Sequence, residues 1–137
     1  MRSIFLKGPS LLILICCWLL AGCASQNSAE MPGGIKITSN PQYDEKMAER
    51  ILKQWYKLLN NSALDFSTGK VEVTFVLYAD GTVSDLNIAR NTAGYVPGWV
   101  CVEAILKCAP FPKWSPAMVK KLGKNSCDVD FTFDYRR

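Results

Sequence analysis

The stretch VEVTFVLYADGTVSDLNIAR, residues 71–90, predicts two β-strands joined by a tight turn, and the rest of the predicted fold is organised around them. Its first half alternates apolar with other side chains, and this period of two is typical of a strand. The turn falls at Asp80-Gly81, since Gly accepts a positive φ without steric cost. On the return strand the apolar parity shifts between Val83 and Leu86, which predicts a bulge. The stretch therefore predicts an antiparallel hairpin.

A third strand is predicted at the end of the chain, over CDVDFTFDY, residues 127–135. The apolar and aromatic side chains of this segment share one face with Cys127. The other face carries Asp128, Asp130, Thr132 and Asp134. This alternation predicts a half-buried strand with a charged outer face.

Three helices are predicted around these strands. The first begins after Asn40 as N-cap and ends near Asn60, with an apolar face of Met47, Ile51, Trp55, Leu58 and Leu59. The second runs from about Pro97 to Ala109, with an expected apolar stripe of Val102, Ile105, Leu106 and Ala109. The third spans residues 115–122. The order α-β-β-α-α-β predicts a small α+β domain over residues 40–137, a three-stranded antiparallel sheet with helices on one face.

Residues 1–22 have the segment order of a secretory signal peptide. Arg2 and Lys7 are positive, residues 11–20 are apolar, and Ala21 and Gly22 are small. The apolar core is too short for a membrane-spanning helix, which needs about 20 apolar residues. We therefore expect an exported protein whose first 22 residues are removed.

The tetrapeptide Leu20-Ala21-Gly22-Cys23 resembles the lipobox of bacterial lipoproteins. The resemblance implies cleavage before Cys23 and acylation of that residue, and Ala24 resembles the sorting residue of outer-membrane cargo. Residues 23–39 are polar and rich in small residues, which indicates a flexible tether with a reach of roughly 20 to 25 Å. The sequence thus predicts a periplasmic domain tied to a bacterial membrane through lipid.

Composition argues against several classes of function. The chain has no histidine, which removes the commonest general base and the commonest metal ligand. Its 16 basic and 12 acidic residues give too weak a bias for nucleic-acid binding. No phosphate loop or paired metal motif is present. We therefore expect no enzyme, no cofactor, no metal and no small-molecule ligand.

Three cysteines remain in the predicted domain, and an oxidising compartment favours a disulfide between two of them. Cys101 and Cys108 are seven residues apart on one predicted helix, or about 10.5 Å, too far to bond to each other. Cys127 on the last strand can meet either. If that strand lies beside the second strand, its start is near Cys101; if it lies beside the first strand, its start is nearer Cys108. We favour Cys101–Cys127, with Cys108–Cys127 as the alternative.

The domain resembles the C-terminal domain of the TolA/TonB family, TolA more closely. The resemblance covers about residues 42–135 and rests on the order of elements and on short motifs: WY (55–56), YADGTV (78–83), PFPKWSP (110–116), SPAMVKKLGKN (115–125) and VDFTF (129–133). It implies a non-enzymatic periplasmic module that binds other proteins. TolA domains contact envelope partners and are exploited by filamentous phage coat proteins and group A colicins, largely by strand addition to an open sheet edge.

This resemblance makes the last strand the candidate binding edge. Asp128, Asp130, Thr132 and Asp134 would discourage indiscriminate pairing and select a basic partner strand. A lipid anchor here stands where TolA and TonB have a transmembrane helix and stalk, so force transmission is not expected. We expect a lipid-anchored binding module for Tol-Pal-type envelope proteins. Alternatives are an immunity, phage-exclusion or decoy lipoprotein, or an accessory subunit of a secretion or conjugation system.

Overall fold

The computed structural model describes residues 40–136 of the chain. The predicted signal peptide, Cys23 and the whole predicted tether (residues 23–39) therefore lie outside the described residues. Within residues 40–136, no helix has both the length and the apolar character needed to cross a membrane.

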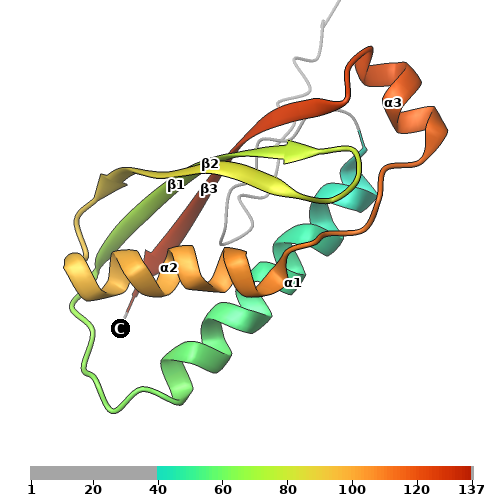
Figure 1. The fold of residues 1–137 in the computed structure, drawn as a ribbon. Helices are drawn as coiled ribbons and strands as arrows, with labels where there is room; N and C mark the ends of the chain where they lie inside the picture. Colours follow the sequence, from blue (N-terminus) through green and yellow to red (C-terminus); the bar gives the residue numbers. More distant parts are fainter. Residues whose placement is uncertain (1–39, 137) are drawn as a thin grey trace, which may run out of the picture.

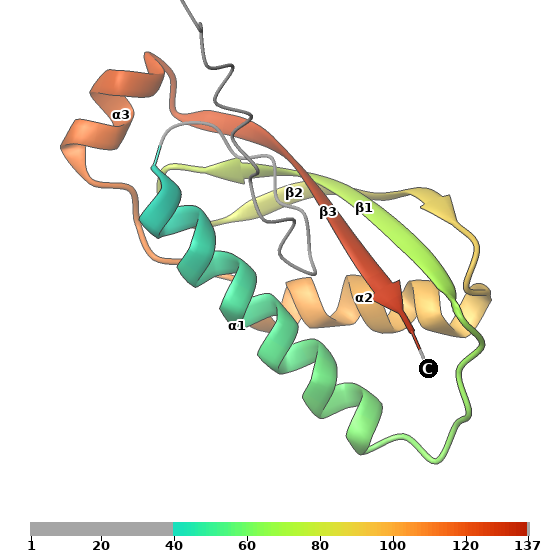
Figure 2. The same cartoon turned by 180° about the vertical axis from the view of Figure 1, so that it is seen from behind.

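The described residues form three helices and one antiparallel sheet. Their bounds are α1 Pro41–Asn60, β1 Gly69–Tyr78, β2 Val83–Asn91, α2 Tyr95–Cys108, α3 Pro116–Leu122 and β3 Ser126–Tyr135. The strand order is β2-β1-β3, so β1 is central and the other two strands are edges. Helices α1 and α2 cover one face of the sheet, while α3 lies at one end of it (Figures 1 and 2). The predicted α+β class, element order and one-sided helix layer are confirmed.

The hairpin between β1 and β2 contains the predicted turn and the predicted bulge. The turn is closed by a hydrogen bond from the Tyr78 amide to the Thr82 carbonyl, and Gly81 has a φ of 89°. Asp85 has a φ of 53° and lies where the β1–β2 register shifts between Thr74 and Val76. The change of apolar parity in the sequence therefore corresponds to a real irregularity in the ladder.

Strand β3 pairs with β1 rather than with β2. The antiparallel register runs from Gly69 opposite Tyr135 to Tyr78 opposite Ser126 without a shift. Both strands turn their apolar residues toward the helices, and these side chains are buried along the whole length. This pairing answers the question that the sequence left open about the neighbour of the last strand.

The ends of the helices are capped as the sequence predicts. The side chain of Asn40 accepts hydrogen bonds from the amides of Gln42 and Tyr43 at the start of α1. Ser115 accepts from the Met118 amide at the start of α3, and Gly123 ends that helix in the left-handed conformation with φ 66°. Each cap satisfies a backbone group that the helix itself leaves unpaired.

The face that α2 turns to the core differs from the predicted stripe. Its buried residues are Pro97, Gly98, Cys101, Ala104, Ile105 and Cys108. Val102 and Ala109 are partly buried and pack against the core, whereas Leu106 is 52% exposed, so the predicted stripe was wrong at Leu106. The reason is that free cysteine packs as a small apolar residue. Treating Cys101 and Cys108 only as disulfide candidates left them out of the helical periodicity.

The core extends from Met47 on α1 to Tyr135 on β3, and no buried residue in it is polar or charged. At one end of the core, the Tyr135 hydroxyl donates to the Pro97 carbonyl at 3.0 Å and accepts from Trp55 Nε1 at 3.0 Å. This hydroxyl joins β3, α1 and α2. Residues 40–136 hold all the core residues that the structure describes, and we expect that part of the chain to fold by itself.

Candidate functional site

The outer edge of β3 presents a row of backbone groups that no other described strand pairs with. At the end of β1, the Ala79 amide donates to the Asn125 carbonyl on the side of β3. The neighbouring Tyr78 amide donates to the Thr82 carbonyl on the side of β2. In an antiparallel ladder these directions alternate from one residue to the next. Because the β1–β3 register has no shift, the β3 residues opposite odd-numbered β1 residues use their backbone N–H and C=O groups to bond to β1. The residues between them direct N–H and C=O outward: Asp128, Asp130, Thr132 and Asp134. These are the four residues that the sequence proposed as a binding edge.

The other edge, on β2, is much less suited to strand pairing. Its ladder with β1 has two register shifts, and Asp85 adopts a positive φ there. Bulges and local twist of this kind protect an edge because an incoming strand cannot keep a continuous register. In contrast, β3 keeps one register over all ten of its residues. Of the two edges of the described sheet, only β3 therefore keeps an uninterrupted register with β1.

The carboxylates along β3 are not equivalent. Asp134 Oδ2 lies 3.7 Å from Lys70 Nζ and 2.6 Å from Arg136 Nη2. The hydrogen bond from Arg136 lowers the pKa of the Asp134 carboxyl, and the positive charges of Arg136 and Lys70 lower it further. Asp128 and Asp130 are exposed and are the carboxylates available to a partner. Thr132 is half-buried. Asp128 and Asp130 therefore differ from Asp134, whose charge is already paired.

An open pocket of about 390 Å³ adjoins the Tyr135 end of β3. Its apolar lining consists of Trp55, Tyr56, Leu59, Leu64, Phe66 and Tyr135, and Asp134 and Arg136 contribute to its border. Leu64 is 57% exposed and Tyr56 50% exposed. Sequence reasoning missed this pocket because Leu64 and Phe66 lie in the loop after α1, outside any periodic segment. The presence of large apolar residues in this loop was the one sequence feature that could have indicated the pocket.

The predicted disulfide is absent, and Cys101, Cys108 and Cys127 are all free and buried. Cys101 Sγ lies 3.4 Å from the Tyr135 hydroxyl, at the end of β3 opposite to Cys127. Eight residues of strand separate those ends by roughly 26 Å, so the favoured Cys101–Cys127 pairing is wrong. Cys108 instead contacts the Arg50 carbonyl at 3.4 Å, so the alternative pairing with Cys127 is not formed either.

Burial shifts the pKa values of several ionisable groups in the described part of the chain. Burial raises the pKa of the Cys101 thiol to about 12 and also raises that of the Tyr135 hydroxyl. Both groups therefore stay protonated near neutral pH. Burial raises the pKa of Asp44 to about 6, but its buried Oδ1 has no hydrogen-bond partner among the described residues. Within residues 40–136, no group of three metal-ligating side chains comes together.

Comparison with known proteins finds similarity in solved structures. Two NMR structures of the C-terminal domain of TonB from Helicobacter pylori are similar to the chain. The longer fragment is 16% identical, with 74% of this chain and 97% of that one covered, and a TM-score of 0.47. The shorter fragment is 20% identical, with 72% and 96% covered, and a TM-score of 0.48. No family model matches the chain, and no curated protein matches it. Similarity at this level does not transfer a function.

Proposed function

We propose that this chain is a lipid-anchored protein-binding module of the bacterial cell envelope, which captures an extended segment of its partner on the edge of β3. One observation carries the proposal: β3 holds a single register with β1 over its whole length and leaves a regular row of backbone donors and acceptors that no described strand pairs with. A partner strand would satisfy this row, and main-chain hydrogen bonds supply affinity in strand addition. The sequence resemblance to TolA/TonB C-terminal domains supports the same mode.

The chemistry of the edge describes the partner. Basic side chains at alternate positions would face the exposed Asp128 and Asp130, two residues apart on the outer face. Toward the Tyr135 end, the adjoining pocket would accept an apolar side chain of the partner. The partner segment is therefore a strand with alternating basic residues and one apolar anchor. Such a strand would come from an envelope protein of the Tol-Pal type, or from a toxin or phage protein.

The location follows from the N-terminal segment. Acylation of Cys23 would hold the domain at the periplasmic face of a membrane, with Ala24 favouring the outer membrane. The tether of residues 23–39 would let the domain stand off the bilayer by roughly 20 to 25 Å. Detection of an acylated N-terminal Cys23 by mass spectrometry of the membrane-extracted protein tests the anchor separately from the binding edge.

The binding edge is tested by site-specific photocrosslinking in cells. A photoreactive residue at position 130 on β3 should give a protein adduct, whereas one at Asn87 on β2 should not. The decisive variant is Thr132→Pro, which removes an outward N–H from an edge strand, a place where Pro is tolerated. Thr132→Val is the matched control because it keeps that N–H.

We expect Thr132→Pro to abolish the adduct at position 130 and Thr132→Val to preserve it, with both variants folded by circular dichroism. The adduct identifies the partner, whose segment can then be compared with the basic and apolar pattern proposed above. An adduct that survives Thr132→Pro in full, or an equal adduct from Asn87, would refute capture by β3.

A further inference from the structure

The outer side of α2 carries an unusual set of exposed apolar side chains. Tyr95 is 77% exposed, Trp99 54%, Leu106 52% and Val96 45%. The rings of Tyr95 and Trp99 meet edge to face with centroids 6.2 Å apart. These residues point away from the core that the opposite side of α2 covers. They form an apolar patch on a helix that has no neighbour on that side among the described elements.

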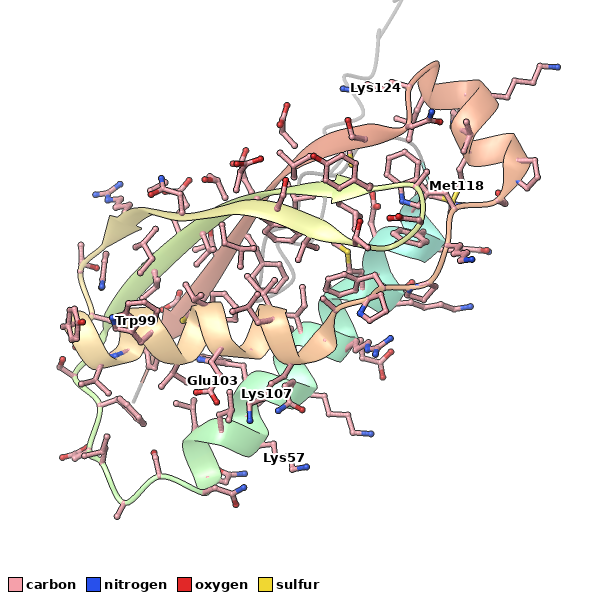
Figure 3. The ribbon with its side chains drawn as sticks, viewed as in Figure 1. Lys57, Trp99, Glu103, Lys107, Met118 and Lys124 are labelled. Atoms are coloured by element: carbon pink, nitrogen blue, oxygen red, sulfur yellow. The ribbon has the colours of Figure 1, made fainter. Side chains whose placement is uncertain are left out.

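A basic groove between α1 and α2 continues this patch. Its positive side chains are Arg50, Lys53, Lys57 and Lys107. Lys107 is paired with Glu103 at 3.1 Å, one helical turn before it, and both side chains are about half exposed. Figure 3 shows Trp99, Glu103 and Lys107 in succession along α2, with Lys57 on α1 beyond Lys107. Aromatic and cationic side chains therefore lie on one continuous surface, called here the α1–α2 face.

We propose that the α1–α2 face docks on an anionic phospholipid surface. Trp and Tyr prefer the boundary between hydrocarbon and water because one part of each side chain is apolar and another is polar. Lysine and arginine stems lie along apolar surface while their charges reach phosphate groups. An apolar patch beside a cluster of cations is the pattern of interfacial binding. The positive groove and the negative lipid phosphates are complementary in charge.

The length of chain before α1 argues for a membrane as the occupant. This step rests on the proposed acylation of Cys23, which would keep the domain within roughly 20 to 25 Å of a bilayer. A weak affinity of the α1–α2 face is then sufficient, because the anchor raises the effective concentration of lipid. With α1 and α2 on the bilayer, the uncovered face of the sheet would point away from it (Figure 2). Docking would thereby present the edge of β3 to periplasmic partners.

The exposed Trp99 can serve as an intrinsic fluorescent probe of docking. Residues 40–137 contain three tryptophans, of which Trp55 is 3% and Trp114 7% exposed. Quenching by acrylamide therefore reports mainly on Trp99. The soluble part 40–137, which carries the whole described core, is mixed with vesicles of phosphatidylglycerol and phosphatidylcholine, or of phosphatidylcholine alone. We expect protection of Trp99 and co-flotation with the anionic vesicles only, both weakened by salt.

The variants compare two pairs of lysines with the same change of charge. The double variant Lys57→Gln, Lys107→Gln should bind anionic vesicles roughly 30-fold more weakly, because each lysine near an anionic surface contributes about fivefold to the affinity. Lys120→Gln with Lys124→Gln, on and after α3, should change it by less than about 3-fold. Trp99→Ala should reduce flotation without altering the circular dichroism spectrum.

Each contrary outcome overturns the proposal. These outcomes are no flotation with anionic vesicles, equal losses from both lysine pairs, or vesicle binding that leaves Trp99 fully quenchable. Photocrosslinking from position 99 to an acidic protein, without any vesicle binding, would assign this face to a protein partner instead. Because residues 40–137 lack Cys23 and Thr132→Pro leaves this face unchanged, failure here is distinguishable from failure of the proposed anchor or binding edge.

Discussion

Replacing Tyr135 by Phe tests whether one buried hydroxyl joins the strand edge to both covering helices. The substitution keeps the ring, which meets Trp55 at a centroid distance of 4.9 Å, and removes only the oxygen. Two hydrogen bonds of 3.0 Å are lost, one from Trp55 Nε1 and one to the Pro97 carbonyl. Trp55 is only 3% exposed, so its indole N–H then stays buried without a partner. The Pro97 carbonyl lies inside α2, where the helix supplies a donor four residues on.

The magnitude follows from one orphaned donor and one lost bond. A buried donor left unsatisfied costs about 1 to 3 kcal/mol and a lost hydrogen bond about 1 kcal/mol, so the free energy of unfolding should fall by about 3 kcal/mol in total. For a domain of this size, with an m-value slightly above about 1 kcal/mol/M, the midpoint of urea unfolding should fall by about 2 to 3 M. Equilibrium unfolding of residues 40–137, followed by circular dichroism, measures both quantities.

Tyr78→Phe is the matched control for this substitution. The Tyr78 hydroxyl meets Ser84 Oγ at 3.2 Å, and the contact is exposed to solvent. Its loss should change the free energy of unfolding by less than about 0.5 kcal/mol. If Tyr135→Phe destabilises the domain no more than Tyr78→Phe does, the hydroxyl does not hold β3, α1 and α2 together.

Two further predictions concern the helix start and the hairpin turn. Burial raises the pKa of Asp44 to about 6, so the folded state binds the Asp44 proton more tightly than the unfolded state does. The cost to folding stability of ionising this carboxyl therefore grows as the pH rises from about 4 to above 6. Allowing for solvent screening, Asp44→Asn should stabilise the domain by about 1 kcal/mol at pH 7 and have little effect at pH 4, measured by urea unfolding; a loss of stability at pH 7 would contradict this. Gly81→Ala should cost about 3 kcal/mol or more, because φ is 89° and the added Cβ would lie 1.9 Å from the Phe111 carbonyl oxygen. Gly123→Ala, where φ is 66° and the Cβ would meet nothing within 4 Å, should cost only about 1 kcal/mol, and equal losses in the two variants would contradict the close approach at Gly81.

Much of the fold could be predicted because its signals are local. The alternation along β1 and β3 reflects burial of one face of a sheet, and the helix caps at Asn40 and Ser115 depend on a few neighbouring residues. The bulge at Asp85 was visible as a shift in apolar parity. The candidate edge residues were predicted for the same reason, since their side chains alternate with the buried ones.

The rest depends on contacts between residues far apart in the chain. The choice of β1 as the neighbour of β3 decides that Cys101 and Cys127 lie at opposite ends of that strand, and local pattern does not contain this choice. The apolar pocket likewise combines α1, the following loop and the end of β3. The basic groove needs α1 and α2 side by side.

Periodicity within short segments is enough to predict the strands, the helices, the turn and the side chains that face outward on β3. Long-range packing, in contrast, makes β3 an unshifted edge strand, pairs Asp134 with Lys70 and Arg136, and leaves Asp128 and Asp130 exposed. Strand order and ion pairing depend on how the whole core packs. That packing brings together groups whose separation in sequence carries no signal of their proximity.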